Sequence, residues 1–212
     1  AVIHISVSSK LSSCYQNAKL AAEDFANVYV VDSQNICTGQ GYLVLKAAKW
    51  AADGLTARAI QMKLQSLAKR VELSFVLDRL DFMAKSGRCS GVLAFGANIL
   101  GIKPMILFKD GEIFSGGVAR GRQKSFEKAL EQLMNYLDAH GGTPDDYRIT
   151  VGYGYDADEG KRLWMQTRAA LRAKYPGAQC EVGLLQIGCT IAVHTGPYAL
   201  GMGVMRRWKK QG

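Results

Sequence analysis

The sequence predicts an α/β fold of two domains, a parallel sheet with helices on both faces followed by a mixed-sheet α/β domain. In the first third of the chain, nearly continuous apolar strands alternate with helical stretches, which is typical of parallel strands covered on both sides. The second half instead begins with a strand and short helical stretches, and a hairpin signal follows before strands and helices alternate again. A hairpin followed by β-α-β-α-β favours a mixed sheet with helices on one side. We therefore expect a first domain over residues 1–72 and a second over residues 73–212.

The first domain is predicted to contain two strands and three helices. The strands are expected at residues 2–7 and 28–31, where apolar residues dominate. A hydroxyl-rich segment, Ser8–Ser13, supplies helix-capping side chains before a helix to about residue 26. Two further helices should end near residues 52 and 69. Because two strands are too few for a covered parallel sheet, we expect this domain to be incomplete at its N-terminus, in part of a longer product.

The second domain is predicted from a longer series of elements. The clearest hairpin signal in the chain is residues 103–115, in which the turn Lys109-Asp110-Gly111-Glu112 separates two apolar runs. Strands are otherwise expected at residues 72–77, 148–153, 179–184 and 199–206, and helices at residues 80–85, 123–139 and 158–174. Another helical stretch is expected between residues 88 and 103.

Composition limits the classes of function. The chain has 212 residues with 27 Lys+Arg against 18 Asp+Glu, and the resulting charge of +9 suits an anionic partner without identifying it. No segment reaches the ~18 to 20 apolar residues of a membrane-spanning helix, and no leader peptide opens the chain, so we expect a cytoplasmic protein. The five cysteines contain no C-x-x-C pair. They indicate small buried apolar residues rather than a disulfide framework or a zinc site.

Common enzyme signatures are absent or incomplete. The sequence contains no P-loop, no H-E-x-x-H and no G-x-S-x-G segment. The segment Gly152–Ala157 lies between a strand and a helix, but it lacks the third glycine of a dinucleotide site. No cofactor is therefore indicated.

A serine cluster is the strongest candidate site. Five hydroxyls lie where the first strand leads into the first helix, at Ser6, Ser8, Ser9, Ser12 and Ser13. Free N–H groups and the positive end of the helix dipole favour an anion at such a position. Capping alone would explain one or two of these serines.

A histidine and three arginines are further candidates. His194 precedes a Gly-Pro turn, and we expect it in a loop where it could approach a ligand. Arg88, Arg120 and Arg122 stand beside glycines at the ends of predicted elements, which suits bidentate binding of phosphate or carboxylate. Ordinary hydrogen bonding of the histidine and solvated surface charge remain the alternatives.

Several of these segments resemble one known family. Residues Ile5–Ala18 are similar to the I-S-x-S-S-x-L-S-G-T-Y-Q-S-A signature of the DegV family of bacterial fatty-acid-binding proteins. Further segments match in the same order, at Val31–Ser33, Gly41–Ala48, Gly87–Arg88, Ile102–Met105, Arg120–Lys124, His194–Gly196 and Ala199–Gly201. The resemblance extends over essentially the whole chain.

The resemblance implies a fatty-acid carrier without a catalytic residue. In such a protein two α/β domains clamp one long-chain fatty acid, with its tail in an apolar tunnel and its carboxylate at the domain interface. Ser12, with Ser13 beside it, matches the carboxylate-binding serine, and His194 matches a histidine near the head group. Arg88 and Arg122 match arginines around the exposed carboxylate, and we place Arg120 with them as facing the head group or a partner.

The resemblance also implies partners. A fatty acid kinase subunit would phosphorylate the bound carboxylate, and contact with the membrane would be transient. The family normally has about 80 residues before the first strand seen here, so a separate N-terminal segment is a possible partner. Where the family has Gly-Thr, this chain has Ser13-Cys14. Candidates for the tunnel wall are Leu43, Val44, Ala47, Phe95, Ile99 and Leu100.

Two other classes of function stay open. A serine hydrolase or acyltransferase could use Ser12 as nucleophile and His194 as base, although no acid partner or oxyanion segment is marked. Nucleic-acid binding is supported by net charge alone, because the aromatic residues do not alternate with the basic clusters.

Overall fold

The computed structural model describes residues 1–88 and 101–207, which form two compact units. Unit 1 contains residues 1–71 and also residues 108–112, and the rest of the chain from Glu72 onward belongs to unit 2. The sequence predicts two continuous domains, with residues 108–112 in the second one rather than with residues 1–71. Within the described part of the chain, none of the helices combines the length and the apolar character needed to cross a membrane.

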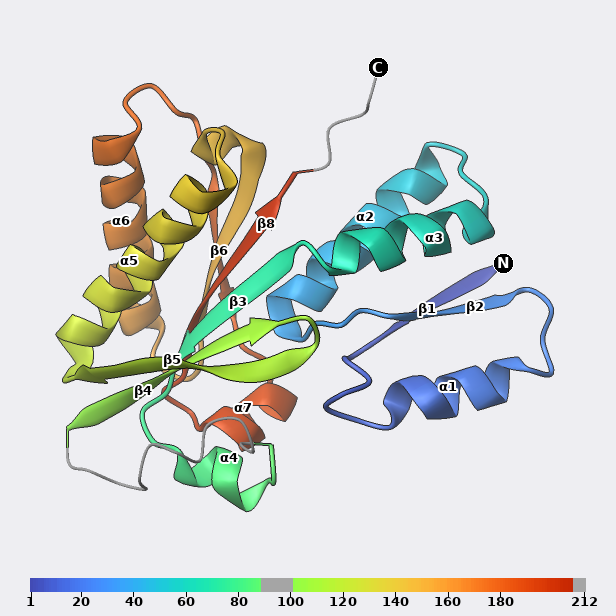
Figure 1. The fold of residues 1–212 in the computed structure, drawn as a ribbon, viewed down its shortest axis with the longest axis horizontal. Helices are drawn as coiled ribbons and strands as arrows, with labels where there is room; N and C mark the ends of the chain where they lie inside the picture. The colour runs from blue at the N-terminus through green and yellow to red at the C-terminus, as the bar shows by residue number, and fades with distance from the viewer. Residues whose placement is uncertain (89–100, 208–212) are drawn as a thin grey trace. The chain divides into compact units, whose positions relative to one another are not determined.

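Unit 1 contains a two-stranded parallel sheet with helices on both faces. Strand β1 (Val2–Ser6) pairs with β2 (Val28–Asp32), and the register places Ser6 opposite Asp32 at the carboxyl ends of both strands. Helices α2 (Cys37–Ala52) and α3 (Ala57–Ala68) lie on one side of this sheet, and α1 (Cys14–Ala22) lies on the other (Figure 1). The predicted α/β layering is confirmed.

The helices of unit 1 follow from capping and apolar spacing. The Thr56 side chain accepts a hydrogen bond from the Ala59 N–H and so begins α3. The buried residues Ile60, Leu64 and Leu67 recur at helical spacing and form the inner face of α3. Helix α1 ends at Ala22, about one turn earlier than expected.

Unit 2 contains a six-stranded mixed sheet with the order β5-β4-β3-β8-β6-β7. Its strands are β3 (Val71–Val76), β4 (Ile102–Lys109), β5 (Glu112–Arg120), β6 (Tyr147–Tyr153), β7 (Val182–Gln186) and β8 (Leu200–Arg206). Strand β6 runs parallel to β7 and antiparallel to β8, which confirms the mixed sheet. Strands β4 and β5 form the expected hairpin, whose turn has positive φ at Asp110 and Gly111, as a type I′ turn requires.

Two long helices cover one face of the unit 2 sheet. Helices α5 (Arg122–His140) and α6 (Ala157–Lys174) lie side by side against the strands (Figure 1). Together they bury a core that includes Phe126, Leu133, Leu163 and Leu171 with the inner residues of β6 and β8. The short segment Pro144–Asp146 is a 3₁₀ turn before β6.

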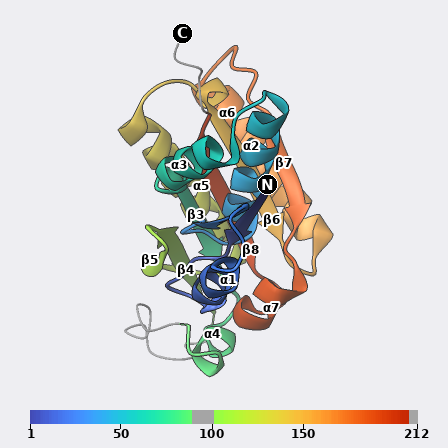
Figure 2. The same ribbon diagram turned by 90° about the vertical axis from the view of Figure 1, so that its right-hand side faces the viewer.

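Two short helices complete unit 2. Helix α4 (Asp81–Lys85) was expected, whereas α7 (Cys189–Thr195) was not. They contact each other, as both views show (Figure 1 and Figure 2). At the end of α7, Gly196 has a φ of 84°, and a Cβ at this position would approach the Phe82 ring to 2.8 Å. Glycine is therefore required to end α7 against α4.

Candidate functional site

The serine junction, which we define as residues Ser6–Ser13, is the polar centre of unit 1. The Asp32 carboxylate accepts hydrogen bonds from the Ser9 N–H at 3.1 Å and from the Ser9 hydroxyl at 2.5 Å. It also accepts the N–H of Gln34 at 2.9 Å. Because these three donors come from the two loops that follow β1 and β2, Asp32 fixes the loops relative to one another.

The tip of the hairpin holds the serine junction from a second direction. Ser8 is fully buried and donates its hydroxyl proton to the Gly111 carbonyl at 2.8 Å. Lys10 forms an ion pair with Glu112 at 3.2 Å, but both side chains are about half exposed, so this pair adds little stability. Ser8 and Ser9 therefore hold the junction in shape.

Ser12 lies two residues before α1 begins, and it is partly exposed. The hydroxyl oxygen accepts the Cys14 N–H at 3.3 Å, and the hydroxyl donates to the Cys14 sulfur at 3.1 Å. Sulfur is a weak acceptor, so a carboxylate could replace it as the partner of this proton. Ser13 is exposed at the N-cap of α1, and its side chain makes no capping hydrogen bond.

Ser6 plays a different part from the other serines. It is 3% exposed, and its hydroxyl has no hydrogen-bond partner among the residues that the structure describes. Of the five serines, Ser8 and Ser9 thus tie loops together and Ser12 bonds to the first residue of α1, whereas Ser13 is exposed and Ser6 is buried without a described partner.

His194 belongs to a helix rather than to the expected loop. It lies in the last turn of α7. This helix ends where the Gly196 N–H donates a hydrogen bond to the Ala192 carbonyl. The Nδ1 atom of His194 is buried and makes no hydrogen bond to any described residue. The prediction of a loop histidine is wrong because the seven residues from Cys189 to Thr195 complete two helical turns before the Gly-Pro turn begins.

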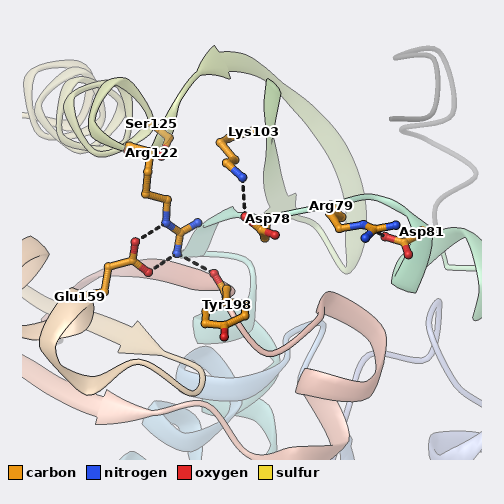
Figure 3. Close-up of polar contacts among 8 residues, drawn as sticks. All are labelled: Asp78, Arg79, Asp81, Lys103, Arg122, Ser125, Glu159 and Tyr198. Carbon is orange, nitrogen blue, oxygen red and sulfur yellow. Dashed lines mark hydrogen bonds and ion pairs between the residues drawn. The ribbon is translucent and has the colours of Figure 1, made fainter. Parts of the chain in front are cut away.

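Arg122 forms a bidentate ion pair within unit 2. Its Nε and Nη2 atoms each donate to one Glu159 oxygen at 2.5 Å, and Nη2 also donates to the Tyr198 carbonyl at 2.6 Å (Figure 3). Its guanidinium lies 5.6 Å from the centre of the Phe126 ring. Arg122 therefore links the starts of α5 and α6 to the segment after α7. One nitrogen, Nη1, is buried without a partner among the described residues.

The other two candidate arginines are exposed. Arg88 donates from Nη1 to the Ser86 carbonyl at 2.6 Å, and Arg120 is the last residue of β5. Near Arg122 in Figure 3, Lys103 is paired with Asp78, and Arg79 bonds to Asp81 at 3.0 Å. The basic side chains of this region thus differ, since some have carboxylate partners, whereas Arg88 and Arg120 have none among the residues that the structure describes.

The candidates for the tunnel wall have different environments. Leu43 is fully buried and Ala47 is 8% exposed, whereas Val44 is 46% exposed and so does not belong to the core of unit 1. The candidates Phe95, Ile99 and Leu100 lie outside the described residues.

The interpretation of the cysteines as buried residues is wrong for two of them. Cys14 and Cys189 are exposed, and Cys37 and Cys180 are partly buried. Burial raises the pKa of the Cys37 and Cys180 thiols, so both are protonated near neutral pH. Cys89 lies outside the described part of the chain.

Two residues of these sites were given no role from the sequence. Asp32 organises the serine junction, and Glu159 neutralises Arg122. The signal for Asp32 was present, because an acidic residue at the carboxyl end of a strand next to a serine loop has N–H groups within reach. No comparable signal marks Glu159, whose partner is 37 residues away along the chain.

Comparison with known proteins decides the family. The model of a family described as "Uncharacterised protein, DegV family" matches residues 1–207. The chain belongs to the DegV family. A DegV domain-containing protein from Deinococcus radiodurans is 32% identical over 203 residues, which cover 95% of this chain and 68% of that protein. The comparisons do not bear out the expectation that about 80 N-terminal residues of the family are missing.

Solved structures of DegV relatives have the same fold. A stearic acid-binding protein from Eubacterium ventriosum is 32% identical with a TM-score of 0.84, and the match covers 97% of this chain and 70% of the other. A DegV family protein from Thermus thermophilus, described by its fatty acid binding, is 30% identical with a TM-score of 0.83, and the match covers 97% of this chain and 71% of the other. The α/β fold that the DegV resemblance implies is thus confirmed.

Proposed function

We propose that this chain is a carrier that binds a long-chain fatty acid and presents its carboxylate to a fatty acid kinase. The observation that supports binding most strongly is the similarity to two solved DegV proteins described as binding fatty acids, each at least 30% identical to this chain. Each buried methylene contributes ~0.8 kcal/mol, so a tail of about 14 methylenes could contribute on the order of 11 kcal/mol before ordering costs. The tail would supply affinity and the head-group residues orientation.

We propose Ser12 and Ser13 as the carboxylate-binding residues of unit 1. The Ser12 hydroxyl supports this role because it donates its proton to the Cys14 sulfur, a weak acceptor, near the N-terminal end of α1. Ser8 and Ser9 keep the loop in place through Gly111 and Asp32, so the hydroxyl of Ser12 is offered from a fixed backbone. A preorganised donor loses less entropy when the ligand binds.

Among the residues of unit 2, we propose His194 for the head group and Arg88, Arg120 and Arg122 for the head group or the kinase. The Nδ1 atom of His194 is buried and has no hydrogen-bond partner in the described part of the chain, so it could bind a head group. Arg88 and Arg120 have exposed guanidinium groups suited to a phosphorylated carboxylate. Arg122 differs, since Glu159 already neutralises it, and its contribution would come through Nη1.

The test is the affinity of the purified chain for stearic acid, measured by titration after delipidation, with native mass spectrometry to follow bound lipid. A hydrogen bond to a charged group contributes ~1.5 to 3 kcal/mol, so Ser12→Ala should weaken binding by about 10- to 150-fold. Thr56→Ala is the matched control, because it also removes a hydroxyl that accepts a helix N–H in unit 1 but lies at the start of α3. Equal affinities of Ser12→Ala and the unaltered chain would contradict the proposed role of Ser12.

Two further measurements separate the remaining functions. Formation of an acyl phosphate from ATP and the bound acid in the presence of the kinase subunit, trapped with hydroxylamine, would support presentation to the kinase. Arg88→Gln with Arg120→Gln should slow this reaction. Unchanged stearic acid affinity in that variant would assign the two arginines to the kinase, and reduced affinity would assign them to the head group. Labelling of Ser12 by a fluorophosphonate probe would instead indicate the serine hydrolase.

A further inference from the structure

A cavity of about 250 Å³ lies beside the C-terminal half of α6, within unit 2. Its polar lining comes from Arg168 and Arg172 of α6 and from the three residues directly before β7, which are Gln179, Cys180 and Glu181. None of these residues belongs to the serine junction, to α7 or to the Arg122 cluster. The proposed carrier function therefore does not account for the cavity.

Within the described ranges of the chain, the two arginines of the cavity have no carboxylate partners. They are four residues apart on α6, which places them on one face of the helix. Across residues 1–88 and 101–207, neither forms an ion pair or a hydrogen bond with a side chain. Two lysines of the same helix do have such partners, since Lys161 pairs with Asp158 and Lys174 pairs with Asp138.

Arg168 is held in place by an aromatic platform. Its guanidinium lies 4.4 Å from the centre of the Trp164 ring. The indole N–H of Trp164 donates to the Val182 carbonyl at 2.7 Å, which ties the ring to β7. A stacked guanidinium keeps its planar set of donors available for an anion, and less entropy is lost when a ligand binds to it.

The charges around the cavity favour an anion. Glu181 supplies one negative charge against the two arginines. The charge of Arg207 lowers the pKa of the Cys180 thiol and the charge of Asp145 raises it, so these two opposite charges also lie near the cavity. The Cys180 thiol is protonated near neutral pH because burial raises its pKa, so it adds no negative charge. The volume lies below the ~300 to 1,000 Å³ of sites for drug-sized ligands, which suits a small group.

We propose that this cavity is a second ligand site that binds a phosphate monoester group through Arg168 and Arg172. Arginine pairs bind phosphate oxygens through parallel N–H donors, and a dianion makes fuller use of two guanidinium groups than a single carboxylate does. The group can belong to a soluble phosphorylated metabolite or to the head of a lipid such as phosphatidic acid. Both sources present the same chemistry to the cavity.

The test uses the full chain and follows the indole N–H signal of Trp164 by NMR, assigned through its loss in Trp164→Phe. Titration with sn-glycerol 3-phosphate should shift this signal saturably. In the double variant Arg168→Gln/Arg172→Gln the affinity should fall at least tenfold. The matched control is Arg148→Gln/Arg162→Gln, which removes the same charge from exposed positions outside the lining and should keep the affinity within twofold.

A second arm identifies the source of the phosphate. Co-sedimentation with phosphatidylcholine vesicles containing phosphatidic acid, lost in the cavity variant and kept in the control, would assign the site to a lipid head group. A response to sn-glycerol 3-phosphate without vesicle binding would assign it to a soluble ester. The proposal is overturned if neither probe binds, or if the cavity variant and its control change equally while thermal unfolding shows both to be folded.

Discussion

Replacing Glu159 with glutamine should destabilise unit 2 strongly, because it leaves the Arg122 guanidinium without a counter-charge. Both side chains are largely enclosed, with 21% of Arg122 and 10% of Glu159 exposed. Breaking a buried ion pair by removing one partner lowers the free energy of unfolding by ~3 to 5 kcal/mol. We expect Glu159→Gln to lie at the lower end, about 3 kcal/mol, because the pair is partly exposed and the glutamine amide oxygen can still accept a hydrogen bond. For a chain of this size that loss corresponds to a fall of about 6 to 12 °C in Tm.

The assay is urea unfolding followed by circular dichroism, with differential scanning calorimetry for Tm. Lys161→Met is the control, because it breaks an ion pair on the same helix whose side chains are 59% and 88% exposed, and it should cost less than ~0.5 kcal/mol. Replacing both partners, as Arg122→Met/Glu159→Leu, should recover much of the lost stability. If Glu159→Gln is as mild as Lys161→Met, the Arg122–Glu159 pair does not hold unit 2 together.

Two further predictions concern unit 2. Burial, followed by the charge of Glu72, raises the pKa of Tyr136 to about 12. The protonated folded form is therefore favoured, so the free energy of unfolding should decrease as pH rises from 10 toward 12, and Tyr136→Phe should reduce this decrease in urea unfolding. An unchanged pH profile in Tyr136→Phe would contradict this assignment. In Gly154→Ala the new Cβ would lie 2.1 Å from the Pro197 carbonyl oxygen, so unfolding experiments should show a loss of ~1 to 3 kcal/mol. Gly41→Ala, whose Cβ meets open space on α2, is its control, and equal effects of the two substitutions would show that the contact with Pro197 costs nothing.

The sequence predicted most elements because their signals are local. Helix α3 has its capping threonine and its apolar spacing within twelve residues, and the β4–β5 hairpin has its Asp-Gly turn. Helix α7 gave no such signal, since it is too short to show a clear period. Strand β7 begins at Val182 rather than at the predicted residue 179, because its pairing with β6 starts at Ile149.

The candidate site was predictable in its residue types and less so in its partners. The serine junction and the arginines stand out in the sequence through glycines, hydroxyls and element ends. Their partners Asp32, Gly111 and Glu159 are 23, 103 and 37 residues away from Ser9, Ser8 and Arg122. Such pairings arise from tertiary packing, and no single-sequence pattern specifies which carboxylate meets which guanidinium.

The acceptor of the Ser8 hydroxyl has a consequence for dividing this protein. A fragment that stops at residue 72 would lack Gly111. The buried Ser8 hydroxyl would then lose the carbonyl oxygen that accepts its proton. Leaving such a donor unsatisfied costs ~1 to 3 kcal/mol. Anyone who wishes to exchange the first unit between homologues should therefore transplant residues 108–112 along with it, since a single cut site cannot separate the two units cleanly.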